Sequence, residues 1–273
     1  MAAPRVVLAF HSHGMCPTNF AMDLAKAMRY TGNLIPLALH EQSCYVDSAR
    51  NKLVRQFLSL PPQDATHLMM LDVDMSFGPD AVLKTLQILE GLQLDVLFGN
   101  YVLGNASNSV FGSPENLSKE ASVLVKLQPN TTYMDVWTGG TGWVMMRRAL
   151  LERMQKECEG PWHWFPRDVT ADGLDRRGED ISFGLRLFGL DPKPKVAGTT
   201  AVLLRHLKQH AFIPDFMTGL AAAEGQNALA FPNPYESQPD KYLIQGHHVL
   251  ELSKLSPEQL AELKAKETEV GTV

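Results

Sequence analysis

Residues 65 to 77 read ATHLMMLDVDMSF, an apolar run that ends in two aspartates one residue apart. A short run of this kind predicts a buried strand. Side chains alternate between the faces of an extended chain, so we expect Asp72 and Asp74 to point to one side and Val73 to the other. Two carboxylates at the end of a buried strand suit Mg²⁺ or Mn²⁺ shared with a substrate's phosphates. The alternative is a turn in which both aspartates bond the local backbone.

Strands and helices alternate around this stretch. We expect strands at residues 5–10, 34–39, 66–71 and 96–99, and helices at 18–30, 43–60 and 79–90. This alternation predicts parallel pairing in a doubly wound α/β sheet, with ligands beyond the carboxyl ends of the strands.

The second half of the chain is less regular. It predicts strands at 121–127, 132–137 and 143–146, helices at 148–157 and 181–190, a loop at 159–177 and an extended segment at 201–204. A capping box at 256–259 predicts a terminal helix reaching residue 266. We therefore expect one α/β domain over residues 1–213, divided near 104, and a mostly irregular or helical extension over 214–273.

Composition narrows the class of protein. The 273 residues are 45% hydrophobic and 20% charged, as in a globular protein with a large core. The net charge of -5 argues against a generally basic nucleic-acid binder but is compatible with a local basic patch. Membrane-spanning runs and a signal peptide are not expected. Three scattered cysteines make neither a disulfide framework nor a zinc cluster and indicate the reducing cytoplasm.

Three later motifs carry polar chemistry. GGTG at residues 139–142 neither follows the first strand nor opens a helix, so it is not a dinucleotide fingerprint. Its glycines fit either a close approach to a bound sugar or a hairpin turn. Glu179 and Asp180 start a helical stripe, where carboxylates act as caps or, alternatively, as a general base. His206 follows an apolar strand and is four residues from His210, a spacing that could place both on one helical face.

Residues 47–54 (DSARNKLV) and 65–77, followed in order by the glycine motif, Glu179–Asp180 and His206, resemble the GT-A glycosyltransferases. The similarity covers about residues 5 to 210 and is closest to small soluble members from bacteria and bacteriophages. It implies a GT-A fold, with a mixed, mainly parallel sheet flanked by helices. Residues 1–104 would bind the nucleotide sugar and residues 105–213 the acceptor. The implied enzyme is a metal-dependent hexosyl- or pentosyltransferase in the cytoplasm of the producing or infected cell.

The resemblance also implies roles for individual residues. The donor is a nucleoside-diphosphate sugar, with UDP the most frequent nucleotide in the family, and Asp180 is the base of an inverting transfer to a hydroxyl. Glu179 holds the acceptor or orients the site. The metal ligands for Mn²⁺ or Mg²⁺ are Asp72, Asp74 and His206. The donor-binding residues are His11, Ser12, His13, Arg50, Asp72, Val73, Gly139 and Gly140. The acceptor-binding residues are Trp162, Trp164 and Arg177.

Several alternatives stay open. Arg50 could lie on a solvated helix face, and the aromatic residues 162–165 could be a hydrophobic plug over the sheet. The acceptor could be a glycan, a small molecule or a hydroxylated base in phage DNA, since stacking with arginines also suits nucleic acid.

A sugar nucleotidyltransferase would carry Lys or Arg directly after the first strand, and HSHGMC at 11–16 has neither. A non-catalytic carbohydrate- or nucleic-acid-binding protein would not need the four acidic and histidine positions Asp72, Asp74, Asp180 and His206.

Overall fold

The computed structural model describes residues 3–101, 111, 128–134, 136–160, 162–169, 175–207, 211–212, 242–245 and 248–251. The predicted strand at 121–127, the predicted terminal helix at 256–266 and most of the predicted extension lie outside these residues. Within the described part of the chain, no helix has the length and apolar character needed to cross a membrane.

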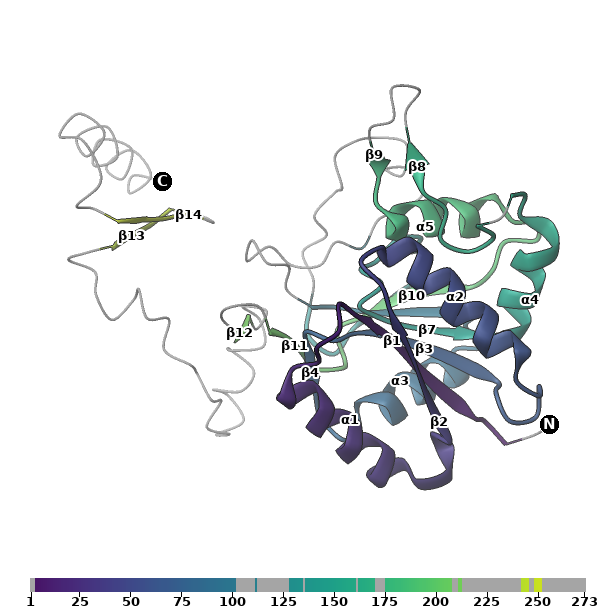
Figure 1. The fold of residues 1–273 in the computed structure, drawn as a ribbon, viewed down its shortest axis with the longest axis horizontal. Coiled ribbons are helices and arrows are strands. Elements are labelled where there is room, and N and C mark those ends of the chain that lie inside the picture. The colour runs from purple at the N-terminus through teal and green to yellow at the C-terminus, as the bar shows by residue number, and fades with distance from the viewer. Residues whose placement is uncertain are drawn as a thin grey trace.

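A seven-stranded mixed sheet forms the centre of the molecule, in the order β2-β1-β3-β7-β5-β10-β6 (Figure 1). The strands are β1 (Val6–Ser12), β2 (Leu37–Gln42), β3 (His67–Asp72), β5 (Val96–Gly99), β6 (Thr132–Met134), β7 (Trp143–Arg147) and β10 (Val196–Thr199). β1 pairs in parallel with β2 and β3, and β5 with β10, whereas β7 and β6 run against their neighbours. The predicted mixed, mainly parallel α/β fold is confirmed.

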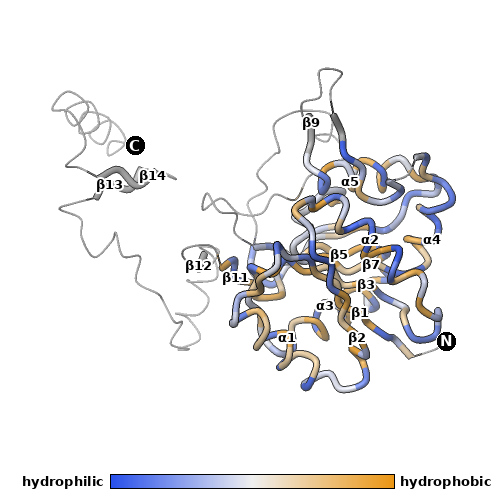
Figure 2. Tube along the Cα trace, viewed as in Figure 1, coloured by the Kyte–Doolittle hydropathy of each residue, from blue (hydrophilic) through white to orange (hydrophobic). Residues whose placement is uncertain are grey.

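Five helices cover the two faces of this sheet. α1 (Thr18–Thr31) and α3 (Ala81–Gly91) lie on one face, and α2 (Val46–Ser59), α4 (Arg148–Glu157) and α5 (Glu179–Gly189) lie on the other (Figure 1). β1 shows why two cores form: Val7 and Ala9 pack under α2, while Val6 and Leu8 pack under α1. In Figure 2 the hydrophobic colour accordingly runs along the central strands and also appears on the helices that pack against them.

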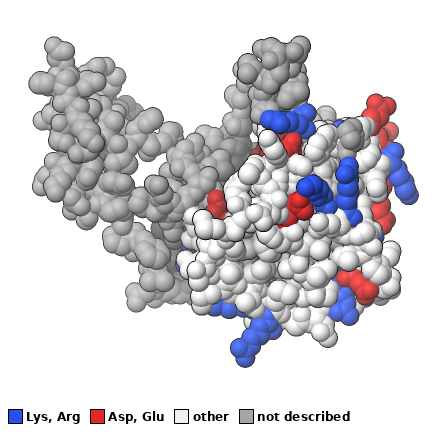
Figure 3. All heavy atoms as spheres, viewed as in Figure 1, with Lys and Arg blue, Asp and Glu red and all other residues white. Residues whose placement is uncertain are grey.

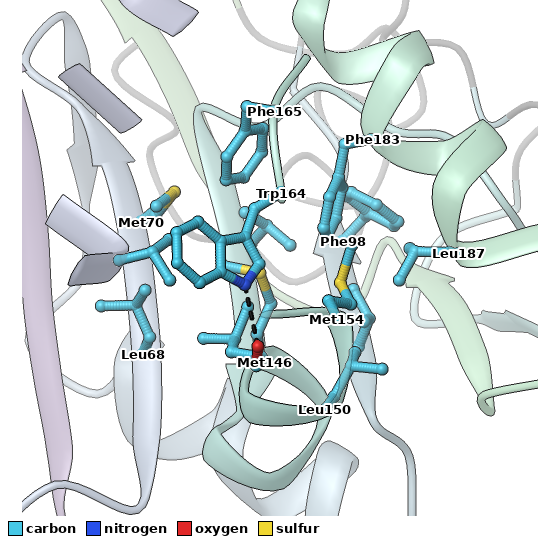
Figure 4. Close-up of a cluster of buried hydrophobic side chains, with 14 of the residues drawn as sticks. Leu68, Met70, Phe98, Met146, Leu150, Met154, Trp164, Phe165, Phe183 and Leu187 are labelled. Carbon is cyan, nitrogen blue, oxygen red and sulfur yellow. Dashed lines mark hydrogen bonds between the residues drawn. The ribbon is translucent and has the colours of Figure 1, made fainter. Parts of the chain in front are cut away.

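The core beneath α2, α4 and α5 contains part of the predicted acceptor loop. Trp164 is fully buried, and its indole Nε1 donates a hydrogen bond to the Leu151 carbonyl at 2.9 Å (Figure 4). Phe165 stacks on Phe183 with ring centroids 4.7 Å apart. The prediction that Trp164 binds an acceptor is therefore wrong, because its ring fills the space between α4 and the sheet, as the hydrophobic-plug alternative requires.

A smaller sheet adjoins the carboxyl end of β3, in the order β12-β11-β4. β4 (Met75–Phe77) pairs antiparallel with β11 (Leu204–Leu207), which pairs with β12 (Ala211–Phe212). His206 lies on strand β11, so it is not on a helical face that it could share with His210. His210 itself lies outside the described residues.

Short elements complete the described chain. They are the 3₁₀ turn η1 (Gly32–Leu34), the strand pair β8 (Asp168–Val169) and β9 (Asp175–Arg177), and the strand pair β13 (Tyr242–Gln245) and β14 (His248–Glu251). On the face drawn in Figure 3, Lys and Arg are interspersed with Asp and Glu over the described surface, which matches the small net charge.

Candidate functional site

Polar residues gather where β1 and β3 end, at the edge of the sheet that the topology predicts for a ligand. The parallel register of these strands sets His11 beside Asp72. The Asp72 amide donates to the Gly142 carbonyl at 3.0 Å, just before β7. Strand pairing thus brings the first strand, the aspartate motif and the glycine motif together.

Arg50 of α2 is the centre of this group. Its side chain is 5% exposed, and its guanidinium bonds Asp72 Oδ1 at 2.9 Å and also Glu179 Oε1. Burial opposes its charge, but the carboxylates of Asp72 and Glu179 outweigh burial and raise the pKa of Arg50. Because Arg50 is buried, the solvated-helix alternative is wrong. Arg50 instead connects α2, the end of β3 and the start of α5.

Asp180 lies next to this ion-pair network at the first turn of α5. Its Oδ1 accepts a hydrogen bond from the Ile181 amide at 2.7 Å, but the cap position of α5 is Gly178, and no side chain caps this helix. Burial, followed by the charge of Glu179, raises the pKa of the Asp180 carboxyl, while Arg50 acts in the opposite direction. A carboxyl with a raised pKa is a better proton acceptor than an ordinary aspartate.

Asp74 and His206 form a second pair. Asp74 Oδ2 lies 3.0 Å from Nε2 of the buried His206, whose ring meets Tyr101 edge to face with centroids 5.6 Å apart. Carboxylate and imidazole have the chemistry of divalent-metal ligands. Within the described ranges, however, no three His, Cys, Asp or Glu side chains are grouped closely enough to hold an ion. Asp72 pairs with Arg50, so the three-ligand metal site remains a prediction.

The glycine motif is packed against side chains of the protein itself. A Cβ on Gly139 would meet the Phe98 ring at 2.6 Å, and one on Gly140 would overlap the Tyr101 hydroxyl. A Cβ on Gly142 would lie 2.6 Å from Asp72 Oδ2. These contacts explain the glycines without a ligand, and the binding of a donor by Gly139 and Gly140 remains a prediction.

Tyr101 belongs to the group although it was not among the predicted site residues. Its hydroxyl accepts a hydrogen bond from the Gly142 amide at 3.0 Å. Burial, together with the negative charge of Asp72, raises the pKa of the phenol, so Tyr101 stays neutral. Its position just beyond β5, at the carboxyl edge of the sheet, is the signal that could have identified it.

The predicted donor loop after β1 is divided between two environments. His11 is buried, and desolvation together with the charge of Arg50 lowers its pKa, so it is neutral at physiological pH. Ser12 turns toward β2, where its hydroxyl lies 2.8 Å from His40 Nε2. His13 is exposed. Only His11 of these three adjoins the Arg50 network.

The remaining predicted residues have different outcomes. Val73 packs against the core beneath α1 and α3. Residues 73 and 74 form a turn rather than extended chain, so Asp72 and Asp74 have separate partners instead of sharing one. Trp162 is half-buried, and its role as an acceptor ligand remains a prediction. The side chain of Arg177 lies outside the described residues.

Comparison with known proteins identifies a fold but no family. No protein-family model matches the chain, and no curated protein matches it. Among solved structures it is similar to A197 from STIV, with a TM-score of 0.51 and 19% identity over 77% of this chain and 91% of that chain. TarS 1-349 from S. aureus gives a TM-score of 0.42 and 14% identity over 72% of this chain and 59% of that one, which is too weak to support an inference. The likeness to A197 shows a shared fold.

Proposed function

We propose that this protein is a GT-A-type glycosyltransferase that moves a sugar from a nucleoside-diphosphate donor to an acceptor hydroxyl. The observation that carries the proposal is the buried guanidinium of Arg50, which bonds both Asp72 at the end of β3 and Glu179 at the start of α5. Residues 50 and 179 are 129 positions apart. An isolated turn at Asp72 and an isolated helix cap at Glu179 would need no such connection.

Asp180 is the group that moves a proton in this proposal. As the acceptor oxygen attacks the anomeric carbon, its proton passes to the Asp180 carboxylate and the bond from that carbon to the diphosphate breaks. Attack comes from the face opposite the leaving group, so the anomeric configuration inverts. The raised pKa of Asp180 supports this assignment, since a base works best when its pKa approaches the working pH.

Glu179 and Arg50 position the reacting groups. Arg50 makes its bonds to carboxylates of the protein, so we assign it to hold Asp72 and Glu179 in place rather than to bind the diphosphate directly. His11, beside Asp72, is the donor-side residue that this arrangement favours. UDP as the nucleotide, and Trp162 and Arg177 as acceptor ligands, belong to the same proposal. So does an acceptor that is a glycan, a small molecule or a hydroxylated DNA base.

Asp74 and His206 would hold Mn²⁺ or Mg²⁺, together with Asp72. Carboxylate and imidazole are divalent-metal ligands, and Asp74 already contacts His206, although Asp72 is bonded to Arg50 and is not grouped with them. When bound, such an ion neutralises charge on the diphosphate leaving group.

Donor turnover tests the proposal. The full chain is incubated with a panel of nucleotide sugars and Mn²⁺, and release of the nucleoside diphosphate is measured with and without candidate acceptors. We expect the nucleoside diphosphate to be released from one class of donor. EDTA should stop this release, and Mn²⁺ or Mg²⁺ should restore it. Full activity in EDTA would rule out the metal.

Two variants sharpen this experiment. Asp74→Asn should abolish metal-dependent release, whereas Asp64→Asn, which changes an exposed aspartate, should leave it unchanged. Synthesis of a nucleotide sugar from a nucleoside triphosphate and a sugar phosphate would identify a nucleotidyltransferase instead. Donor binding without any turnover would identify a binding protein.

A further inference from the structure

A hollow of about 350 Å³ opens on the side of the β4–β11 ladder away from His206. Arg205 and Ser76 are paired across this ladder, and both line the hollow. Their neighbours His206 and Met75 are also paired, and His206 bonds Asp74. Because successive side chains of a strand point to opposite faces, the hollow and the Asp74–His206 pair lie back to back.

The floor of the hollow is built by Asp23 of α1. Its Oδ2 accepts hydrogen bonds from the Ser76 hydroxyl at 2.7 Å and from the Phe77 amide at 3.2 Å, and its Oδ1 lies 3.6 Å from Lys26. These contacts tie α1 to β4, which lie side by side in Figure 1. The hollow is therefore bounded by bonded elements rather than by independent surface side chains.

The charges that line the hollow leave one cation in excess. Lys26 pairs with Asp23, and Lys84 pairs with Asp80 at 2.8 Å. Arg205 also lines the hollow and is half-buried, and in the described part of the chain no carboxylate is bonded to its guanidinium. Three cations against two carboxylates leave a net charge of about +1 at the position of Arg205.

The rest of the lining is apolar. Val202 is buried in the wall, Pro79 is exposed, and Leu203 is 42% exposed at the rim. The hollow has the size of a small-molecule site, and its lining combines five charged side chains with apolar ones. A guanidinium next to apolar surface favours an anion attached to an apolar body over an inorganic anion.

We propose that this hollow is a second ligand site, which binds a small organic molecule with one anionic group, a carboxylate or a phosphate, on an apolar body. The anionic group bonds Arg205, and the apolar body lies against Pro79, Val202 and Leu203. This proposal stands apart from the glycosyltransferase proposal, because neither Asp180 nor the Arg50 network contributes to it.

Titration of the full-length ¹⁵N-labelled protein tests the site. Benzoate and phenyl phosphate serve as the two anionic probes, and acetate serves as the probe without an apolar body. We expect both aromatic anions to shift the amide signals of residues 76–78, 80–81 and 203–205 saturably, and to bind at least tenfold more tightly than acetate. The tighter of the two aromatic anions identifies the preferred anionic group.

Variants separate a specific site from general charge attraction. Arg205→Gln should weaken the aromatic anions at least tenfold, while Arg29→Gln, which removes an exposed charge from α1, should change their affinity less than twofold. Leu203→Ser should weaken the aromatic anions but not acetate. If Arg205→Gln does not fold, Arg205→Lys keeps the charge without the planar fork and should bind more weakly than the wild type.

Three results would overturn the proposal. The first is the absence of saturable shifts at these amides. The second is an equal loss of binding in Arg205→Gln and Arg29→Gln. The third is equal affinity for acetate and benzoate. The first two would mean that the hollow attracts anions no better than the rest of the surface, and the third would mean that its apolar lining does not contribute to binding.

Discussion

At the scale of single residues, the site depends on side chains that satisfy one another inside the protein. Arg50 is the clearest case, because its buried guanidinium bonds Asp72 and Glu179, which are themselves only 28% and 24% exposed. Removal of one partner from a buried ion-pair network leaves charges without compensation. Arg50 should therefore matter for folding as much as for activity.

Replacement of Arg50 by Met should lower the free energy of unfolding by about 3 kcal/mol, because two partly buried carboxylates lose their partner. Urea denaturation followed by circular dichroism measures this loss. Arg55→Met, an exposed arginine on the same helix, is the matched control and should cost less than about 1 kcal/mol. Equal effects of the two substitutions would show that the Arg50 network contributes little.

Gly140→Ala should destabilise the protein by about 1–3 kcal/mol, because the new methyl group would overlap the Tyr101 hydroxyl in a packed interior. Gly91→Ala is the control, since a Cβ at that position meets nothing within 4 Å. Thermal unfolding of both variants measures the difference. A neutral Gly140→Ala would mean that the loop at 139–142 moves away from Tyr101 at no cost.

At the scale of elements, the end of the sheet remote from the site carries its own polar contact. His67 at the start of β3 lies 3.0 Å from Glu90 of α3, and Arg147 of β7 bonds the same carboxylate. Burial and the charge of Arg147 lower the pKa of His67 to about 4. The neutral imidazole is favoured in the folded protein, although the Glu90 carboxylate acts in the opposite direction.

Protonation of His67 should therefore destabilise the fold in acid. The unfolded chain takes up this proton near pH 6.5, and the folded protein takes it up only near pH 4. Stability is complete above pH 6.5 and falls between these values, by about 3 kcal/mol at 1.4 kcal/mol per pH unit. His67→Gln should flatten the unfolding free energy over this interval, whereas His13→Gln, at an exposed position, should keep the wild-type slope.

Elements with strong local patterns were predictable from the sequence. The strand at 96–99 and the helix at 148–157 match β5 and α4 residue for residue, because apolar periodicity sets them. The direction of β7 was not predictable. Its residues Trp143–Met146 are fully buried, so its sequence resembles that of a central parallel strand although it runs antiparallel.

The site residues were likewise predictable only in part. The sequence placed Asp72, Glu179 and Asp180 at element ends, where the structure has them, whereas His206, expected just after a strand, lies within β11. It could not show that Arg50 pairs with Asp72 and Glu179, because that contact depends on how α2 and α5 pack over the sheet. Nor could it separate Trp162 from Trp164, since two aromatic residues in one loop have no periodicity that tells a buried ring from an accessible one.

At the scale of the whole molecule, the sheet brings two halves of the chain to one edge. Strands β1 and β3 supply His11 and Asp72 from the first half, and α5 supplies Glu179 and Asp180 from the second. The likeness to A197 concerns this framework alone and carries no information about the chemistry of the site. The functional proposal therefore depends on whether Asp180 accepts a proton in this framework.

Turnover by Asp180→Asn is the measurement that tests this claim most directly. Asparagine keeps the size of the side chain and caps a helix about as well as aspartate, but it has no basicity. If Asp180 is the general base, kcat for sugar transfer should fall about 10²–10⁴-fold while donor affinity hardly changes, and the wild-type product should have an inverted anomeric centre by NMR. An Asp180→Asn variant with normal turnover, or a product with retained configuration, would contradict the account.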